Sequence, residues 1–130
     1  MAEPIMDQYA KVSSYDVHAY QVRCTFDTGT TLQYRSRDAT PARATTTTVK
    51  VTLPKVYTEV VGFKTARFAA VGVAALEWIL STNNVNVDGT LTFTSVNSAG
   101  AATAPAVGDV AFFDIMVSCD VLNDRFLGAG

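Results

Sequence analysis

The chain has 130 residues, 48% of them hydrophobic and only 17% charged, which suits one domain around one buried core. Its formal net charge of −2 argues against strong non-specific binding of nucleic acid by the whole surface. The first residues lack the regions of a secretory signal, and no apolar run of about 18 residues predicts a membrane span.

The N-terminal part predicts an arm followed by a strand. Residues 1–14 show no sustained period and contain Pro4, so we expect an arm before a single domain over residues 15–130. Residues 15–26 alternate and predict the first strand. His18 lies there without a second ligand or nucleophile at a useful spacing. One face of this strand carries Tyr20, Val22, Cys24 and Phe26, and the other Gln21, Arg23 and Thr25.

The middle of the chain predicts two strands around a proline corner. Asp27-Thr28-Gly29 predicts a turn, residues 30–36 another strand, and residues 37–44 a polar connector. Pro54 then separates a strand before it from a strand over residues 56–63, because proline cannot donate to a central ladder. The strand before Pro54 places Val49, Val51 and Leu53 on one face and Thr48, Lys50 and Thr52 on the other.

Residues 67–81 fit both a helical and an alternating period, and we favour a strand in which Trp78 belongs to the core. Asp88-Gly89 predicts a two-residue hairpin within residues 85–94, with a bulge in one longer strand as the competing interpretation. Residues 95–105 are small, polar and aperiodic, which predicts a mobile loop.

The C-terminal segment over residues 109–127 predicts a helix. A strand would leave bulky apolar groups on both faces, whereas a helix gathers them on one stripe. Asp109 can cap its start and Gly128 can end it. We therefore expect an α+β domain, with an antiparallel sheet over residues 15–94, a loop over 95–108 and this helix. The stripe consists of Phe112, Ile115, Met116, Cys119, Leu122 and Phe126.

The sequence contains no recognisable catalytic or cofactor motif. Its acidic residues are scattered, and no predicted element brings two carboxylates together for acid–base chemistry. Four aspartates lack the ligand pattern of a calcium loop, so we expect turn formers and helix caps instead. We predict no enzyme activity, no cofactor and no bound metal. These aspartates are Asp88, Asp109, Asp120 and Asp124.

Three features of the composition allow two interpretations each. The shortage of charge fits either a small domain with outward threonines or a surface covered by another subunit, and we favour the second. Cys24 and Cys119 belong to no metal or redox motif, and we expect buried free thiols in a reducing compartment rather than a disulfide framework. The positive bias of residues 23–50 fits a solvated face or an RNA site. It comes from Arg23, Arg35, Arg37, Arg43 and Lys50.

Two blocks in order resemble the coat proteins of the single-stranded RNA bacteriophages, the levivirus type. They are AYQVRCTF, residues 19–26, and VKVTLPKVYTEVVG, residues 49–62, and LEWILS, residues 76–81, looks like the next strand of that family. The resemblance implies an antiparallel sheet with a C-terminal helix, an interlocked homodimer and an icosahedral shell around genomic single-stranded RNA. The implied location is the virion, assembled in the bacterial host cytoplasm without a membrane.

The resemblance also implies an RNA-hairpin site on the sheet and a dimer contact along the C-terminal stripe. The alternative from another class is a virion decoration or tail-associated β-rich module that binds no RNA. In this family the last helix packs over the partner, so the stripe residues named above would form the dimer contact. Carried onto this chain, the RNA face would present Gln21, Arg23, Thr25, Thr48, Lys50 and Thr52.

Overall fold

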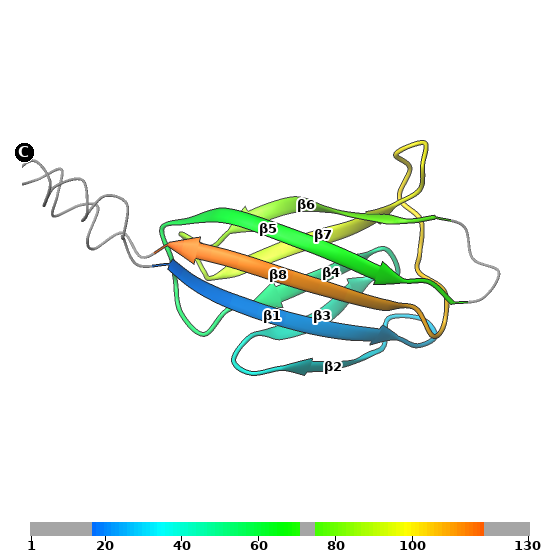
Figure 1. The fold of residues 1–130 in the computed structure, drawn as a ribbon, viewed down its shortest axis with the longest axis horizontal. Helices are drawn as coiled ribbons and strands as arrows, with labels where there is room; N and C mark the ends of the chain where they lie inside the picture. The colour runs from blue at the N-terminus through cyan, green and yellow to red at the C-terminus, as the bar shows by residue number, and fades with distance from the viewer. Residues whose placement is uncertain (1–16, 71–74, 119–130) are drawn as a thin grey trace, which may run out of the picture.

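The computed structural model describes residues 17–70 and 75–118, and these form two antiparallel four-stranded sheets packed face to face (Figure 1). Sheet A has the order β2-β1-β8-β5, and sheet B has the order β3-β4-β7-β6. The described chain is therefore an all-β sandwich, and the predicted α+β class is wrong. The strands are β1 (Val17–Phe26), β2 (Leu32–Ser36), β3 (Thr40–Thr45), β4 (Thr48–Thr52), β5 (Glu59–Phe68), β6 (Glu77–Asn84), β7 (Thr90–Val96) and β8 (Val110–Ser118).

The core lies between the two sheets and follows the alternation that the sequence predicts for β1 and β4. Trp78 is a core residue as predicted, because its ring stacks on Phe26 and meets Phe113 edge-on, each at 5.3 Å between centroids. Burial of these apolar side chains is the main force that joins the sheets. The largest inward side chains come from both sheets and are Val22, Phe26, Val49, Val51, Leu91, Phe93, Phe113 and Ile115.

The C-terminal helix prediction is wrong over residues 110–118, which form the strand β8. This strand lies in the interior of sheet A and pairs with β1 on one side and β5 on the other. Its inward side chains fill the core, while Phe112 and Met116 are half-buried on the outer face. When an interior strand carries apolar side chains on both faces, some of them are three or four residues apart in the sequence, which is also the spacing of an apolar helix face. Residues 119–127 of the predicted helix lie outside the described residues.

The predicted connector over residues 37–44 also differs, because most of it belongs to β3. This edge strand tolerates Pro41, which is buried opposite Val51 of β4. The strand predicted over 56–63 begins at Glu59 and continues to Phe68. The strand preference for residues 67–81 is confirmed at the two ends of that run, where β5 ends and β6 begins.

The β6–β7 connection is longer than the predicted two-residue hairpin. Residues 85–89 form the loop, and the carbonyl of Asn84 accepts hydrogen bonds from the N–H groups of Val87, Asp88 and Gly89 at 2.9–3.1 Å. Gly89 has φ +76°, and a Cβ there would lie 2.8 Å from the carbonyl oxygen of Lys55. Glycine is therefore required at this position both by conformation and by space.

The ends of the described chain lie side by side. Val17 at the start of β1 is paired with Ser118 at the end of β8. The β1–β2 turn and the β7–β8 loop lie together at the opposite end of the sandwich (Figure 1). The first and last described residues therefore lie at one end of the sandwich, and these two connections lie at the other.

We expect the Cys24 thiol to be unreactive in the folded protein. Cys24 is fully buried, and desolvation raises the pKa of its thiol from 9.0 to about 12. In a Cys119→Ser background, a thiol reagent at pH 8 should modify Cys24 only after urea is added. The raised pKa also predicts that the contribution of Cys24 to folding stability is constant below pH 9 and falls between pH 9 and 12, where only the unfolded thiol ionises readily. Rapid labelling of the native protein would contradict this burial.

Candidate binding surfaces

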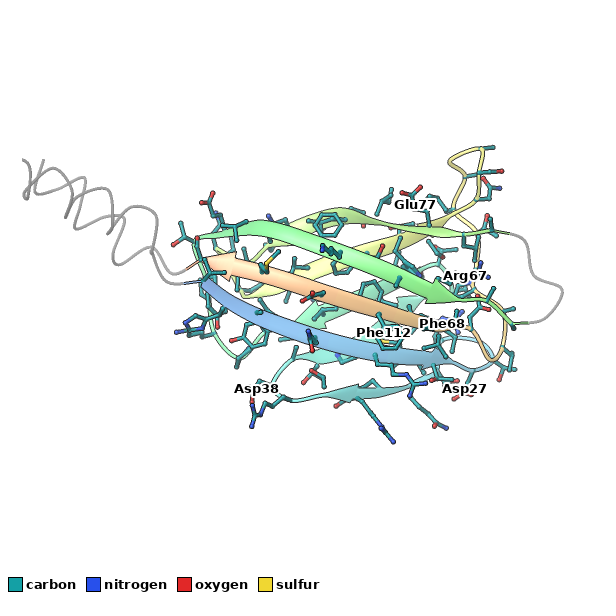
Figure 2. All side chains as sticks on the ribbon, viewed as in Figure 1. Asp27, Asp38, Arg67, Phe68, Glu77 and Phe112 are labelled. Atoms are coloured by element: carbon teal, nitrogen blue, oxygen red, sulfur yellow. The ribbon has the colours of Figure 1, made fainter. Side chains whose placement is uncertain are left out.

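A hollow of about 790 Å³ lies on the outer face of sheet A where β2 diverges from β1. The outward side chains of Gln21, Arg23 and Arg35 lie on its β1–β2 side, and those of Phe112 and Asp114 come from β8. Arg37 and Asp38 line it where the chain leaves β2. Figure 2 shows Asp38 near the β2 edge and Phe112 over the middle of the sheet. We call this surface the sheet A hollow.

The arginines of the sheet A hollow have no carboxylate partner within the described chain. The Arg23 guanidinium lies 5.7 Å from the centroid of the Phe112 ring, and Arg35 is its cross-strand neighbour on β2. Arg35 and Arg37 are exposed and make no ion pair with any described residue. Three guanidinium groups therefore lie in one hollow together with the two carboxylates of Asp38 and Asp114, and their excess positive charge suits an anionic group.

The six predicted RNA-binding residues lie in two places. Gln21, Arg23 and Thr25 are on β1 and point from the outer face of sheet A, because their neighbours Val22 and Cys24 fill the core. The other three are on β4 and point from the outer face of sheet B, which is the opposite side of the sandwich. The alternation of each strand is as predicted, but the structure does not bring the six side chains onto one surface. The β4 residues are Thr48, Lys50 and Thr52.

The predicted dimer residues do not form a stripe where they are described. Ile115 is fully buried in the core between the sheets. Phe112 and Met116 lie on the outer face of sheet A, and the Phe112 ring meets Phe68 edge-on at 5.6 Å between centroids (Figure 2). The remaining three residues, Cys119, Leu122 and Phe126, lie outside the described residues.

The outer face of sheet B carries rows of threonines. Successive cross-strand pairs join Thr48 to Thr94, Lys50 to Thr92 and Thr52 to Thr90. Lys50 is exposed and is the charged member of these rows. This face agrees with the interpretation that outward threonines explain part of the low charge of the chain.

Arg43 is a buried arginine that the sequence grouped with the surface charges. Its side chain donates to the carbonyls of Asp27 at 2.8 Å, Thr31 at 3.3 Å and Thr46 at 2.9 Å, and its guanidinium lies 5.1 Å from the Phe26 ring centroid. Burial lowers the pKa of the Arg43 guanidinium, and the nearby Asp27 opposes this effect. Arg43 therefore connects the β1–β2 turn of sheet A to the β3–β4 turn of sheet B and is not available to RNA.

Asp109 is a buried carboxylate that sequence reasoning took for a helix cap. It lies just before β8, is 1% exposed and pairs with Arg67 of β5 at 2.7 Å. Its oxygens also accept the N–H groups of Ala70 at 2.7 Å and Ala106 at 3.3 Å. Asp109 thus fastens the β7–β8 loop to the end of β5, near the labelled Arg67 in Figure 2. An aspartate among small residues gave no sequence signal for this role.

The β5 edge is the third exposed feature and consists of Val61, Phe63 and Phe68. β5 ends the order of sheet A, so its outer side has no neighbouring strand among the residues described. Val61 is 36%, Phe63 38% and Phe68 65% exposed. Exposed apolar side chains along a ten-residue strand with one unpaired edge are typical of a surface that associates with another chain.

His18 is a half-buried residue near the start of β1 that takes part in a hydrogen-bond network. Its Nδ1 lies 3.2 Å from the hydroxyl of Tyr57, which also bonds to the hydroxyl of Tyr20. Over residues 17–70 and 75–118, there is no cluster of three or more histidine, cysteine or carboxylate side chains suited to hold a metal ion. The same residues include no helix with the length and apolar character needed to cross a membrane.

Comparison with known proteins found no match: no family model, no curated protein and no solved structure is similar to this chain. The surfaces that bear on function are therefore the sheet A hollow, the threonine face of sheet B and the β5 edge.

Proposed function

We propose that this chain is a structural protein of a virus particle, which acts by assembling with other copies of itself and with other protein chains. The sequence blocks over residues 19–26 and 49–62 resemble phage coat proteins, and this supports a place in the virion. The observation that carries the assembly part is the β5 edge, which offers both backbone groups and apolar side chains to a partner.

The β5 edge suits specific association rather than indiscriminate aggregation. The unpaired edge of this ten-residue strand is long enough to add a strand from a second chain. The register shift between Val60 and Gly62 and the exposed Lys64 interrupt its regular apolar surface. A bulge and a lysine on a strand edge discourage indiscriminate pairing with other strands, so a partner strand must match their positions.

Of the two versions of this proposal, we favour the decoration or tail-associated module over the RNA-binding coat protein. The coat family is characterised by a sheet and a C-terminal helix, whereas the described chain forms a sandwich. The six residues that the resemblance assigns to RNA lie on opposite outer faces of that sandwich. A decoration module needs neither the helix nor a shared RNA face.

Electron microscopy of the protein expressed alone, together with its absorbance ratio at 260 and 280 nm, tests the choice between the versions. We expect a small uniform oligomer without nucleic acid that binds to preformed particles. Closed shells that contain RNA would instead establish the coat protein version. A monomer that binds neither particles nor other copies would contradict the proposal as a whole.

Lysine substitutions on the β5 edge are expected to weaken self-association. A Val61→Lys, Phe68→Lys variant places two charges on the surface that we propose to be buried, and desolvating them opposes assembly. We expect a tenfold or larger increase in the dissociation constant, an effect of about 1.4 kcal/mol or more, measured by analytical ultracentrifugation. The matched control is Val87→Lys, because Val87 is 73% exposed in the β6–β7 loop. Equal effects of both variants would exclude the β5 edge as the contact.

A further inference from the structure

We infer that the sheet A hollow binds an extended, acidic segment of a partner protein. The hollow lies over β1, β2 and β8, whereas the proposed assembly surface is the opposite edge of sheet A. This inference therefore goes beyond the proposed function and holds whether or not the chain associates with itself.

The first observation is the charge of the hollow. Three arginines line the hollow without an ion pair to a described residue, namely Arg23, Arg35 and Arg37. Two negatively charged side chains, Asp38 and Asp114, also line it. Arg67, by contrast, forms an ion pair with Asp109 elsewhere in the described chain. With three guanidinium groups and two carboxylates, the hollow carries one excess positive charge, which is complementary to a carboxylate supplied by another molecule.

The second observation is that β1 continues past the end of its neighbour. The β1–β2 ladder ends at the pair Val22 and Ser36, yet Ala19, Tyr20 and Gln21 of β1 also line the hollow. No described strand lies beside Ala19 and Gln21 on that side. An extended peptide that continues the line of β2 would hydrogen-bond to these backbone groups as an added strand.

The third observation is the apolar floor beside the charges. Phe112 lies half-buried in the hollow opposite Arg23, and the exposed Ala19 lies further along β1, opposite Met116. Alternate side chains of an added strand point to the same side of a sheet. A partner with acidic residues near Arg35 and Arg37 and small apolar residues beside Ala19 would match both parts of the surface.

A protein segment fits these observations better than a nucleic acid. A phosphodiester backbone carries a charge at every nucleotide, so Asp38 and Asp114 would repel it throughout the hollow. A peptide can place its carboxylates only opposite the arginines. In addition, a free strand edge is satisfied by another peptide backbone and not by a sugar–phosphate chain.

The test is fluorescence anisotropy with a labelled short peptide of alternating glutamate and valine, added to the full-length protein. We expect saturable binding that weakens with salt, and no binding of the matching peptide of lysine and valine. Arg35→Glu should weaken binding of the acidic peptide about tenfold or more, whereas Asp38→Asn should strengthen it about threefold. These opposite signs separate recognition in the hollow from a general loss of structure.

The matched control is Lys50→Glu, which makes the same charge change on the outer face of sheet B. It should leave the dissociation constant within about twofold of the unsubstituted protein, and thermal unfolding should show that every variant is folded. An acidic peptide that does not bind, or an equal loss from Lys50→Glu, would overturn the inference. Displacement of the peptide by a lower concentration of an oligouridine would also overturn it, in favour of nucleic acid.

Discussion

Replacing Asp109 with alanine is expected to lower the free energy of unfolding by about 3–5 kcal/mol, which is the usual loss when one member of a buried ion pair is removed. The substitution leaves the Arg67 side chain, which is only 10% exposed, without the carboxylate at 2.7 Å. It also removes the acceptor for the N–H groups of Ala70 and Ala106. Urea unfolding followed by the fluorescence of Trp78 would measure the loss.

Two further variants make this prediction specific. Asp109→Asn keeps one acceptor oxygen and the side-chain volume, so its loss should be smaller than that of alanine. Asp38→Ala removes an exposed carboxylate, and we expect it to change the free energy of unfolding by less than about 0.5 kcal/mol. If Asp109→Ala and Asp38→Ala had equal effects, the carboxylate of Asp109 would not hold the β7–β8 loop to β5.

Replacing Arg43 with methionine should lower the free energy of unfolding by about 2–4 kcal/mol. Methionine preserves most of the apolar packing but donates no hydrogen bond to the carbonyls of Asp27, Thr31 and Thr46. It also removes the cation above the Phe26 ring. Because these partners belong to turns of both sheets, the loss should appear in the single cooperative unfolding of the sandwich.

The control for Arg43 is Lys50→Met on the neighbouring strand β4. Lys50 is exposed and points from the outer face of sheet B, so its replacement should change stability by less than about 0.5 kcal/mol. Arg43→Lys should recover only part of the loss, since an ammonium group lacks the fork that reaches carbonyls in two turns. A stable Arg43→Met variant would mean that water satisfies these carbonyls.

Alternation predicted the inward faces of β1 and β4, because each strand has a buried side and an outer side that differ in polarity. The same rule failed for β8, because this interior strand carries Phe112 and Met116 outward as well as Phe113 and Ile115 inward. A pattern with apolar groups on both faces does not distinguish an interior strand from a helix. The error changed the fold class.

The arrangement of strands in space could not be predicted from local patterns. Arg23 and Lys50 each occupy the polar face of a strand, but the sequence does not state that β1 and β4 belong to different sheets. Arg43 and Asp109 were missed for a related reason. A buried charge is recognised by its partners. Most partners of Arg43 and Asp109 lie more than ten residues away in the sequence. The two near ones, Thr46 and Ala106, lie in a turn and in an irregular loop.

The pairing of Val17 with Ser118 determines how the domain can be permuted or inserted into another protein. Two residues opposite each other in an antiparallel ladder have Cα atoms only about 4.5–5.5 Å apart. A short glycine-rich linker would therefore join Ser118 to Val17, and new ends opened in the β6–β7 loop would give a circular permutant of residues 17–118 with the same two sheets. For the same reason the sandwich can be inserted into a surface loop of a host protein, displayed on a single stalk with its connection-rich end pointing outward.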